Sequence, residues 1–420
     1  MELKESILDL GRRARAAARV LLSLTTDRKN AALHAMADEI DASSVLILAA
    51  NDKDVSKATA DGLSTAMIDR LKLDDQRIKG MAQGIRQAAA LNDSVGEVIK
   101  EWTRPNGIRI SKVRVPIGVI GMIYESRPNV TSDAAALCLK SGNATILRGG
   151  SEAMHSNRAI ADALQAGCAK AGLPRDSILL VPGTDRDAVR HLAEMDRYVD
   201  VIIPRGGRDL IDAVVSYARM PVIKHSHGVC AIYVDKQADL AMAEEIVINA
   251  KTQRPSACNA AETLLLHRDI APAFLDRLAQ RLAGVRLRAD ETGFAHLSTL
   301  KYSRLERASE ADWTTEYLDL TLAIKVVENE AAAIAHIDRY GSHHSDCIVT
   351  ADATAAETFL NAVDSAVVYW NASTRFTDGG EFGFGAEVGI STEKVGVRGP
   401  MGLEELTTYK YVIRGDGQVR

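Results

Sequence analysis

The sequence predicts an α/β fold built on parallel, doubly wound sheets, and two series of alternating segments support this. Between residues 117 and 218, short apolar segments alternate with segments of helical periodicity. A second series of the same kind runs from residue 229 to residue 370. The first 95 residues are helical in pattern and show no chemistry of their own. Strands that alternate with helices in this way form parallel sheets covered on both faces.

The composition is that of an ordinary globular protein. The 420 residues are enough for two or three domains, with 46% hydrophobic residues, 25% charged residues and a net charge of −5. This charge argues against a general nucleic-acid or membrane-surface binder, and no apolar run of about 18 residues predicts a transmembrane helix. The charged, amphipathic start is unlike a signal peptide, so a cytoplasmic protein is expected.

The cysteines predict reduced thiols and no metal centre. They stand at positions 138, 168, 230, 258 and 347 and form no CxxC pair. This odd number and wide spacing suit neither a disulfide framework nor a zinc site. His343-His344 has no carboxylate cluster nearby and is not expected to bind metal.

The N-terminal part predicts helices over residues 3–24, 27–48, 68–71 and 78–91, with Thr26 and Asp27 able to cap the second. Asn106-Gly107 then predicts a hairpin turn before an alternating strand over 108–115. The apolar phase of that strand switches between Ile110 and Val113, as at a bulge. The tail at 407–413 also alternates, and it could pair with this ribbon or with another subunit.

The first βα series predicts four strands and four helices, and glycine turns follow two of the strands. The expected strands are 117–124, 144–147, 178–181 and 199–203, and the helices are 132–139, 153–171, 185–194 and 209–218. No GxGxxG is present, but Arg148-Gly149-Gly150 and Arg205-Gly206-Gly207 each offer backbone N–H groups and a guanidinium to a phosphate. Taken singly, each could be a plain turn. Two in one sheet favour a nucleotide site.

The second series surrounds a candidate nucleophile. Strands are expected over 229–234, 262–266, 322–327, 346–349 and 367–370, and helices over 238–250, 271–282, 330–339 and 353–360. Between the first helix and the next strand lies Gln253-Arg254-Pro255-Ser256-Ala257-Cys258-Asn259. A thiolate attacks acyl carbons and leaves again easily, so Cys258 is a candidate for acyl chemistry. The heptapeptide by itself favours the plainer interpretation that Cys258 is a small buried hydrophobe, and only the rest of the sequence reverses this.

The ordered motifs resemble those of the aldehyde dehydrogenase superfamily over nearly the whole chain. Pro116-Ile117-Gly118-Val119-Ile120-Gly121 is similar to its initial strand, and Glu125-Ser126-Arg127-Pro128-Asn129-Val130-Thr131 stands where the family carries its oxyanion asparagine. The resemblance assigns that role to Asn129 and the catalytic thiol to Cys258, with Glu316 matching the glutamate that holds the nicotinamide ribose. The cofactor-binding residues that it implies are Arg148, Gly149, Gly150, Ser151, Pro182, Gly183, Arg205, Gly206, Gly207 and Glu316.

Two departures from the superfamily bear on the reaction. Arg148 replaces the usual lysine, and an arginine near the adenine ribose can accommodate a 2′-phosphate, so NADP(H) is favoured over NAD(H). Where hydrolytic members carry a glutamate base, Ile223-Lys224-His225-Ser226-His227-Gly228 contains no carboxylate. A hydrolytic enzyme needs a base to activate water, whereas a reductase of acyl phosphates does not.

The resemblance within the superfamily is to the branch that reduces gamma-glutamyl phosphate. It implies NADPH-dependent reduction of L-glutamate 5-phosphate to L-glutamate 5-semialdehyde and phosphate through a Cys258 thioester, in proline biosynthesis. Further substrate-binding candidates are Arg127, Arg254, His225 and Arg375, although each arginine could instead form a surface ion pair. The chain could also contact the kinase that makes the acyl phosphate, and a homo-oligomer is expected; nucleic acid and membrane are not expected partners.

These expectations define three parts of the chain and leave two other functions open. Residues 1–100 and 116–227 are expected to form a Rossmann-like cofactor domain, and 228–400 a catalytic domain with Cys258. Residues 101–115 and 401–420 are expected to form a β arm for oligomerisation. The alternatives are a hydrolytic semialdehyde dehydrogenase, and a cysteine hydrolase or nucleotide-binding scaffold without this redox chemistry.

Overall fold

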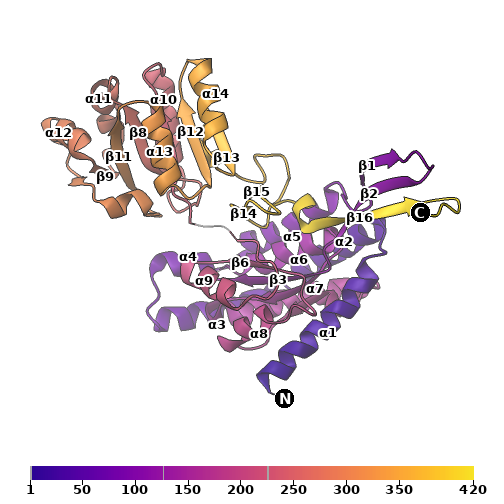
Figure 1. Cartoon of the computed structure of the whole chain (residues 1–420). Helices are drawn as coiled ribbons and strands as arrows, with labels where there is room; N and C mark the ends of the chain where they lie inside the picture. Colours follow the sequence, from indigo (N-terminus) through magenta and orange to yellow (C-terminus); the bar gives the residue numbers. More distant parts are fainter. Residues whose placement is uncertain (1, 126, 225–226) are drawn as a thin grey trace. The chain divides into compact units, whose positions relative to one another are not determined.

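The computed structural model describes residues 2–125, 127–224 and 227–420, and the chain divides into two compact units (Figure 1). Unit 1 comprises Met1–Lys224, Gly383–Gly389 and Met401–Arg420. Unit 2 comprises His225–Phe382 and Ile390–Pro400. Each unit has its own parallel sheet.

Unit 1 contains a helical N-terminal part followed by a βα series. Its α-helices are α1 Leu3–Leu21, α2 Thr26–Ala42, α3 Ser44–Ala60, α4 Thr65–Leu71, α5 Asp75–Ala90, α6 Asn129–Lys140, α7 Met154–Lys170, α8 Asp187–Ala193 and α9 Arg208–Tyr217. Its strands are β1 Val98–Thr103, β2 Arg109–Pro116, β3 Val119–Tyr124, β4 Ala144–Arg148, β5 Ile178–Leu180, β6 Val201–Arg205 and β16 Thr407–Arg414. Short 3-10 turns lie at Ser151–Ala153, Arg175–Ser177 and Glu404–Leu406.

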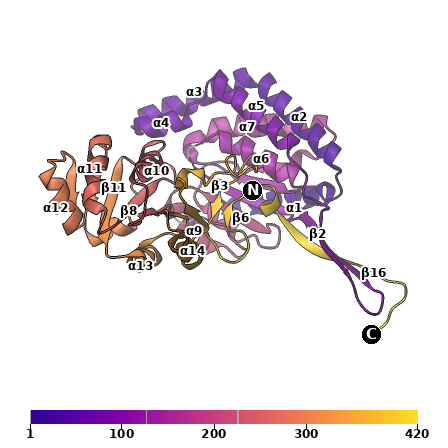
Figure 2. The same cartoon turned by 90° about the horizontal axis from the view of Figure 1, so that it is seen from above.

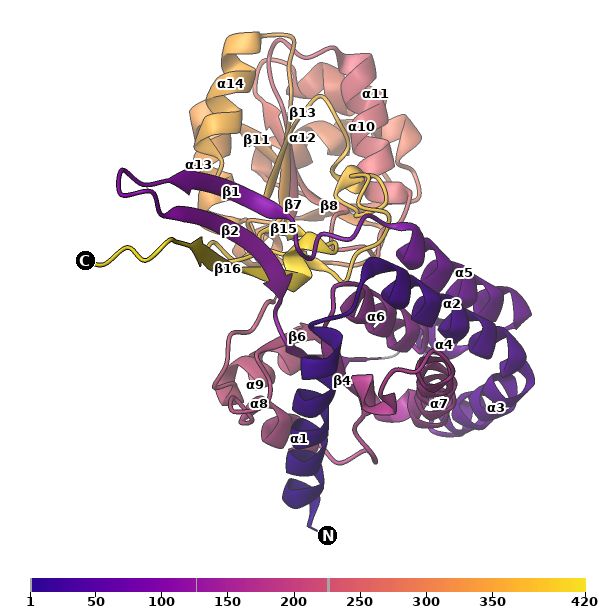
Figure 3. The ribbon, with the colours of Figure 1, turned by 90° about the vertical axis from the view of Figure 1, so that its right-hand side faces the viewer.

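The core of unit 1 is a parallel four-stranded sheet in the order β5-β4-β3-β6. Strands β3 and β4 are buried along their whole length, as expected for a sheet covered on both faces. Helices α2 and α3 pack on α7, and α2 also packs on α5, while α1 packs against α8. Figures 2 and 3 show α2, α3, α5, α6 and α7 together on one side of this sheet and α9 on the other, and Figure 3 shows α8 beside α9.

The long helix predicted over 27–48 is wrong, because the chain breaks at Ser43 into α2 and α3. Ser43 has φ −93° and ψ 8°, and it ends one helix and begins the next. Short polar side chains compete for backbone hydrogen bonds, which makes Ser43-Ser44 a natural break. The cap of α2 is Thr25, whose hydroxyl accepts from Arg28 N at 3.4 Å, rather than the predicted Thr26 or Asp27.

An antiparallel ribbon in the order β1-β2-β16 extends from unit 1. The predicted hairpin at Asn106-Gly107 is present, with Gly107 at φ 86°. The register shifts between Val98 and Lys100 on β1, opposite Lys112 and Val113, so the bulge lies on the partner of the strand where it was predicted. Of the two pairings left open for the tail, the structure has β16 on β2.

Unit 2 is a second α/β layer structure. Its helices are α10 Leu240–Thr252, α11 Ala271–Arg281, α12 Glu291–Thr299, α13 Glu330–Tyr340 and α14 Ala353–Ala362. Its strands are β7 Cys230–Val234, β8 Ala261–His267, β9 Arg286–Ala289, β10 Leu305–Arg307, β11 Thr321–Val327, β12 Ser345–Val349, β13 Val367–Trp370, β14 Ile390–Ser391 and β15 Gly399–Pro400. Short 3-10 turns lie at Glu310–Thr314 and Thr374–Phe376.

Seven of these strands form a parallel sheet in the order β10-β9-β11-β8-β7-β12-β13. Alternate residues of β7 face opposite sides: Ile232 packs among α10, α11 and α12, whereas Tyr233 packs against α13 and α14. Both faces are therefore covered, as Figure 1 shows. The predicted α/β class is confirmed here. The sequence analysis missed β9, α12 and β10, because the segment 286–289 is half charged and lies near the sheet edge.

None of the helices in the described part of the chain is long and apolar enough to span a membrane. Within the same residues, no group of three or more His, Cys, Asp or Glu side chains is placed to hold a metal ion.

One buried histidine of unit 2 predicts a pH-dependent stability. His336 is 6% exposed, packs between the rings of Trp313 and Tyr340, and has no hydrogen-bond partner for either ring nitrogen among the described residues. Burial, and then the charges of Lys325 and Arg339, lower its pKa to about 3. Below the ordinary histidine pKa of about 6.5 the unfolded chain therefore binds a proton that the folded chain does not.

We expect this linkage to lower the stability by about 2 kcal/mol between pH 7 and pH 5. The His336→Leu variant should lose this part of the acid sensitivity, measured as the drop in thermal midpoint between the two pH values. His34→Leu, at an exposed position on α2, is the control and should show the wild-type drop. An equal drop in His336→Leu and wild type would show that His336 is protonated in the folded protein.

Candidate active site

In unit 1, the predicted residues gather at the carboxyl edge of the sheet. Asn129 is the first residue of α6, after β3, and Arg148 ends β4. Pro182-Gly183 follows β5, and Arg205 ends β6. Since parallel strands end at one edge, residues from four separate segments meet there, which is where α/β sheets bind ligands.

Arg148 is enclosed at this edge. Arg148 is 9% exposed, and its Nη2 donates to the carbonyls of Thr184 at 3.5 Å and Asp185 at 3.3 Å. Burial lowers the pKa of its guanidinium, and the Nε–H has no partner among the described residues. Arg148 therefore braces the turn after Gly183, and Nε is the donor left over for a ligand.

The glycines beside Arg148 have little room for a side chain. A Cβ on Gly149 would lie 2.1 Å from Asn157 Nδ2, and one on Gly150 would lie 2.2 Å from Glu152 Oε1. Gly183 differs, since it has φ 78° and nothing within 4 Å of its Cβ position. Ser151 opens a 3-10 turn that leads into α7. The turn at Gly149-Gly150 is tightly packed, and the turn at Gly183 is open. Both fit a dinucleotide phosphate that approaches the backbone closely.

A carboxylate lies at the second glycine turn. Glu125 Oε2 accepts from Gly207 N at 2.9 Å, just before α9 begins, and a Cβ on Gly206 would lie 2.4 Å from the same oxygen. Glu125 thus lies at the N–H group that was predicted to meet a phosphate. An anion that binds there must displace this side chain. Arg127, two residues on, is partly buried, and its N–H donates to the Glu125 carbonyl at 2.8 Å.

In unit 2, Cys258 lies on the loop between α10 and β8, at the amino edge of the sheet. It is partly buried, whereas the other four cysteines are buried, and no cysteine among the described residues is in a disulfide. Its carbonyl accepts from the Cys230 thiol at 3.3 Å. The loop is also tied to the turn at Thr374–Phe376, since Asn259 Nδ2 donates to the Thr377 carbonyl at 2.8 Å.

Gly228 packs directly on the Cys258 backbone. A Cβ at this glycine would lie 1.7 Å from the Cys258 carbonyl oxygen. The Gly228 N–H donates to Glu316 Oε1 at 2.9 Å, and burial raises the pKa of Glu316. Glu316 therefore fixes the position of Gly228, and the backbone of the candidate nucleophile Cys258 packs against this glycine.

A buried ion pair joins the two ends of the loop that carries Cys258. Lys251 Nζ lies 2.6 Å from Glu262 Oε2, and the side chains are 0% and 1% exposed. Lys251 is in the last turn of α10 and Glu262 is near the start of β8. Burial raises the pKa of Glu262, and the charge of Lys251 opposes this. The sequence analysis missed this pair, because nothing in the local sequence pairs Lys251 with Glu262 across the loop.

Two predicted arginines accompany Cys258. Arg375 Nε donates to Gln253 Oε1 at 2.8 Å. Burial, and then the charge of Arg254, lower the pKa of Arg375, while Cys258 raises it. The structure thus brings Arg254, Arg375 and Cys258 together, with two cations available to an anionic substrate. His225 lies outside the described residues.

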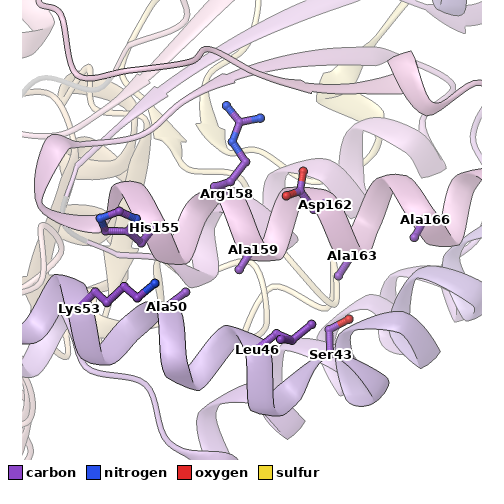
Figure 4. A pocket seen from close by; sticks show the side chains of 10 residues that line it. All are labelled: Ser43, Leu46, Ala50, Lys53, His155, Arg158, Ala159, Asp162, Ala163 and Ala166. Carbon is purple, nitrogen blue, oxygen red and sulfur yellow. The ribbon is translucent and has the colours of Figure 1, made fainter.

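Two surface pockets lie elsewhere in unit 1. One of about 410 Å³ lies between α3 and α7, and none of the predicted site residues lines it (Figure 4). Another, of about 260 Å³, is formed by α1, α7 and β5 and is lined by Arg13, Arg158 and Pro182 among others. Only Pro182 connects either pocket with the predicted cofactor residues.

The packing of Gly228 leads to a prediction. In Gly228→Ala the new methyl group collides with the backbone of Cys258, which must move. A shift of about 1 Å at a nucleophile can cost roughly 10²-fold in turnover, and we expect a kcat loss of this order with a lower thermal midpoint. The matched control is Gly284→Ala, where nothing lies within 4 Å of the new Cβ. Wild-type kcat in Gly228→Ala would contradict the close packing.

Comparison with known proteins identifies the family and the fold. The model of the aldehyde dehydrogenase family matches residues 4–301. An acetylating aldehyde dehydrogenase from Geobacillus thermoglucosidasius has the same fold, with a TM-score of 0.70 at 17% identity over 100% of this chain and 98% of that one. The chain belongs to the aldehyde dehydrogenase family.

Within that family its relatives are gamma-glutamyl phosphate reductases, as the sequence resemblance indicated. The enzyme of Paramagnetospirillum magneticum is 52% identical over 100% of this chain and 98% of its own length. That of Moorella thermoacetica is 55% identical over 98% of this chain and 97% of its own. The crystal structure of the Thermotoga maritima gamma-glutamyl phosphate reductase has a TM-score of 0.96 at 46% identity, covering 99% of this chain and 100% of that one.

Proposed function

We propose that this chain reduces gamma-glutamyl phosphate to L-glutamate 5-semialdehyde and phosphate with NADPH, as a step of proline biosynthesis. The observation that carries the proposal is the setting of Cys258, a partly buried thiol on a braced loop beside Arg254 and Arg375. The names of relatives that are about half identical over their full length support the same reaction.

The first step is the attack of the Cys258 thiolate on the acyl carbon. A C–S bond forms, the bond from the acyl carbon to the phosphate oxygen breaks, and phosphate leaves with the electron pair. Arg254 and Arg375 bind the anionic substrate through charge-assisted hydrogen bonds and favour the departure of phosphate. We assign to Asn129 and to the Cys258 N–H the stabilisation of the oxyanions that form before and after the thioester.

When it is bound, NADP(H) would supply the hydride that resolves the thioester. The residues that would hold it are the Gly149-Gly150-Ser151 and Pro182-Gly183 turns, Arg205-Gly206-Gly207 and Glu316. The 2′-phosphate preference rests on Arg148, whose Nε–H is the unpartnered donor described above. We further propose the cofactor role for residues 1–100 and 116–227, catalysis for 228–400, and oligomerisation for 101–115 and 401–420.

A hydrolytic dehydrogenase is the second candidate, because one observation favours it. Burial raises the pKa of Glu316, and a carboxylate with a raised pKa can serve as a general base toward water. Against this, the carboxylate already accepts the Gly228 N–H.

The proposed function is tested by the reverse reaction. The purified chain is supplied with L-glutamate 5-semialdehyde, phosphate, and either NADP⁺ or NAD⁺, and nucleotide reduction is followed by absorbance. We expect turnover that needs all three reactants and has a higher kcat/KM with NADP⁺. The absence of turnover with either nucleotide would reject the redox function. A preference for NAD⁺ would reject the role of Arg148 alone.

A further inference from the structure

We propose that Asp133 is a positioning residue that orients the side-chain amide of Asn129, an inference that rests on the oxyanion role proposed for Asn129. The two residues lie four apart on α6, so their side chains share one face of the helix. Asn129 Nδ2 donates to Asp133 Oδ2 at 2.8 Å.

The chemistry of the pair fixes which way the amide points. A carboxylate only accepts hydrogen bonds, so it selects the NH₂ end of Asn129 and rejects the carbonyl end. One amide hydrogen is held by Asp133, and the second stays on the same nitrogen for another acceptor. Without such a partner, the amide could turn its carbonyl oxygen toward a developing oxyanion and repel it.

The surroundings hold Asp133 in place. Ser132 Oγ donates to Asp133 Oδ1 at 3.5 Å, and α5 lies beside the carboxylate, since a Cβ on Gly84 would make an ordinary van der Waals contact of 3.8 Å with the same oxygen. Burial raises the pKa of Asp133 to about 6, against the hydrogen bonds from Asn129 and Ser132. Asn129 is exposed at the start of α6, whereas Asp133 is partly buried behind it. Because the exposed Asn129 donates to the more enclosed Asp133, the hydrogen bond limits the motion of the Asn129 side chain.

A double-mutant cycle tests the proposal, with kcat of the reverse reaction as the readout. Asp133→Ala should lower kcat about 10- to 100-fold and leave the KM values for semialdehyde and NADP⁺ within about twofold. Asp133→Asn should recover part of this loss, because its carbonyl can still accept from Asn129. The control Asp52→Ala, at an exposed position of α3, should keep the wild-type kcat.

The decisive comparison is in the Asn129→Ala background. If Asp133 acts through Asn129, the double variant is no slower than Asn129→Ala alone. Equal, additive losses in both backgrounds would overturn the proposal and leave Asp133 a purely structural residue, as would wild-type kcat in Asp133→Ala.

A crystal structure of Asp133→Ala gives a second readout that does not depend on turnover. We expect an unchanged α6 backbone with the Asn129 amide in a new or mixed orientation. An Asn129 side chain that keeps its wild-type orientation would also overturn the proposal. An inactive wild-type protein would instead reject the proposed function, while this structural readout would still decide the role of Asp133.

Discussion

Cys258→Ala is expected to abolish turnover, while NADPH still binds with wild-type affinity. The thioester cannot form without the thiol, and the residues proposed for the nucleotide lie mainly on the turns of unit 1. The measurements are NADPH fluorescence titration and the reverse-reaction rate. Cys168→Ala, at a buried cysteine of α7 in unit 1, is the control and should remain active. Wild-type turnover by Cys258→Ala would reject the covalent mechanism.

Asn129→Ala is expected to lower kcat by roughly 10²–10³-fold, the usual loss for one oxyanion donor. The effect should fall on kcat rather than on KM, because the interaction strengthens only as charge develops on the acyl oxygen. Asn361→Ala, at an exposed position of α14, is the control. A variant in which only KM rises would make Asn129 a substrate-binding residue.

The regular parts of the fold could be predicted because local sequence determines them. In β3 a nearly continuous apolar run is enough to identify a buried parallel strand. The break at Ser43 and the half-charged strand β9, next to the edge strand β10, were missed, since apolar periodicity gives little information at helix junctions and near sheet edges.

Candidate site residues could be proposed from motifs, but the contacts that hold them in place could not. Nothing in the local sequence places Gly228 on the carbonyl of Cys258, 30 residues away, or the Glu125 carboxylate at Gly207. Lys251 and Glu262 are separated by a loop, and only the fold makes them an ion pair. These contacts depend on tertiary packing, for which one sequence without its structure has no direct signal.

In the proposed mechanism, Cys258 forms a thioester and phosphate accepts its acyl group. The oxidation of semialdehyde without phosphate tests this mechanism most directly. No carboxylate stands in the Ile223–Gly228 stretch to direct water onto the thioester, so the acyl-enzyme should stall. We expect a burst of about one NADPH per site, an acyl adduct on Cys258 by mass spectrometry, and sustained turnover once phosphate is added. Steady NADPH formation without phosphate, with free glutamate as the product, would contradict this mechanism and identify a hydrolytic dehydrogenase.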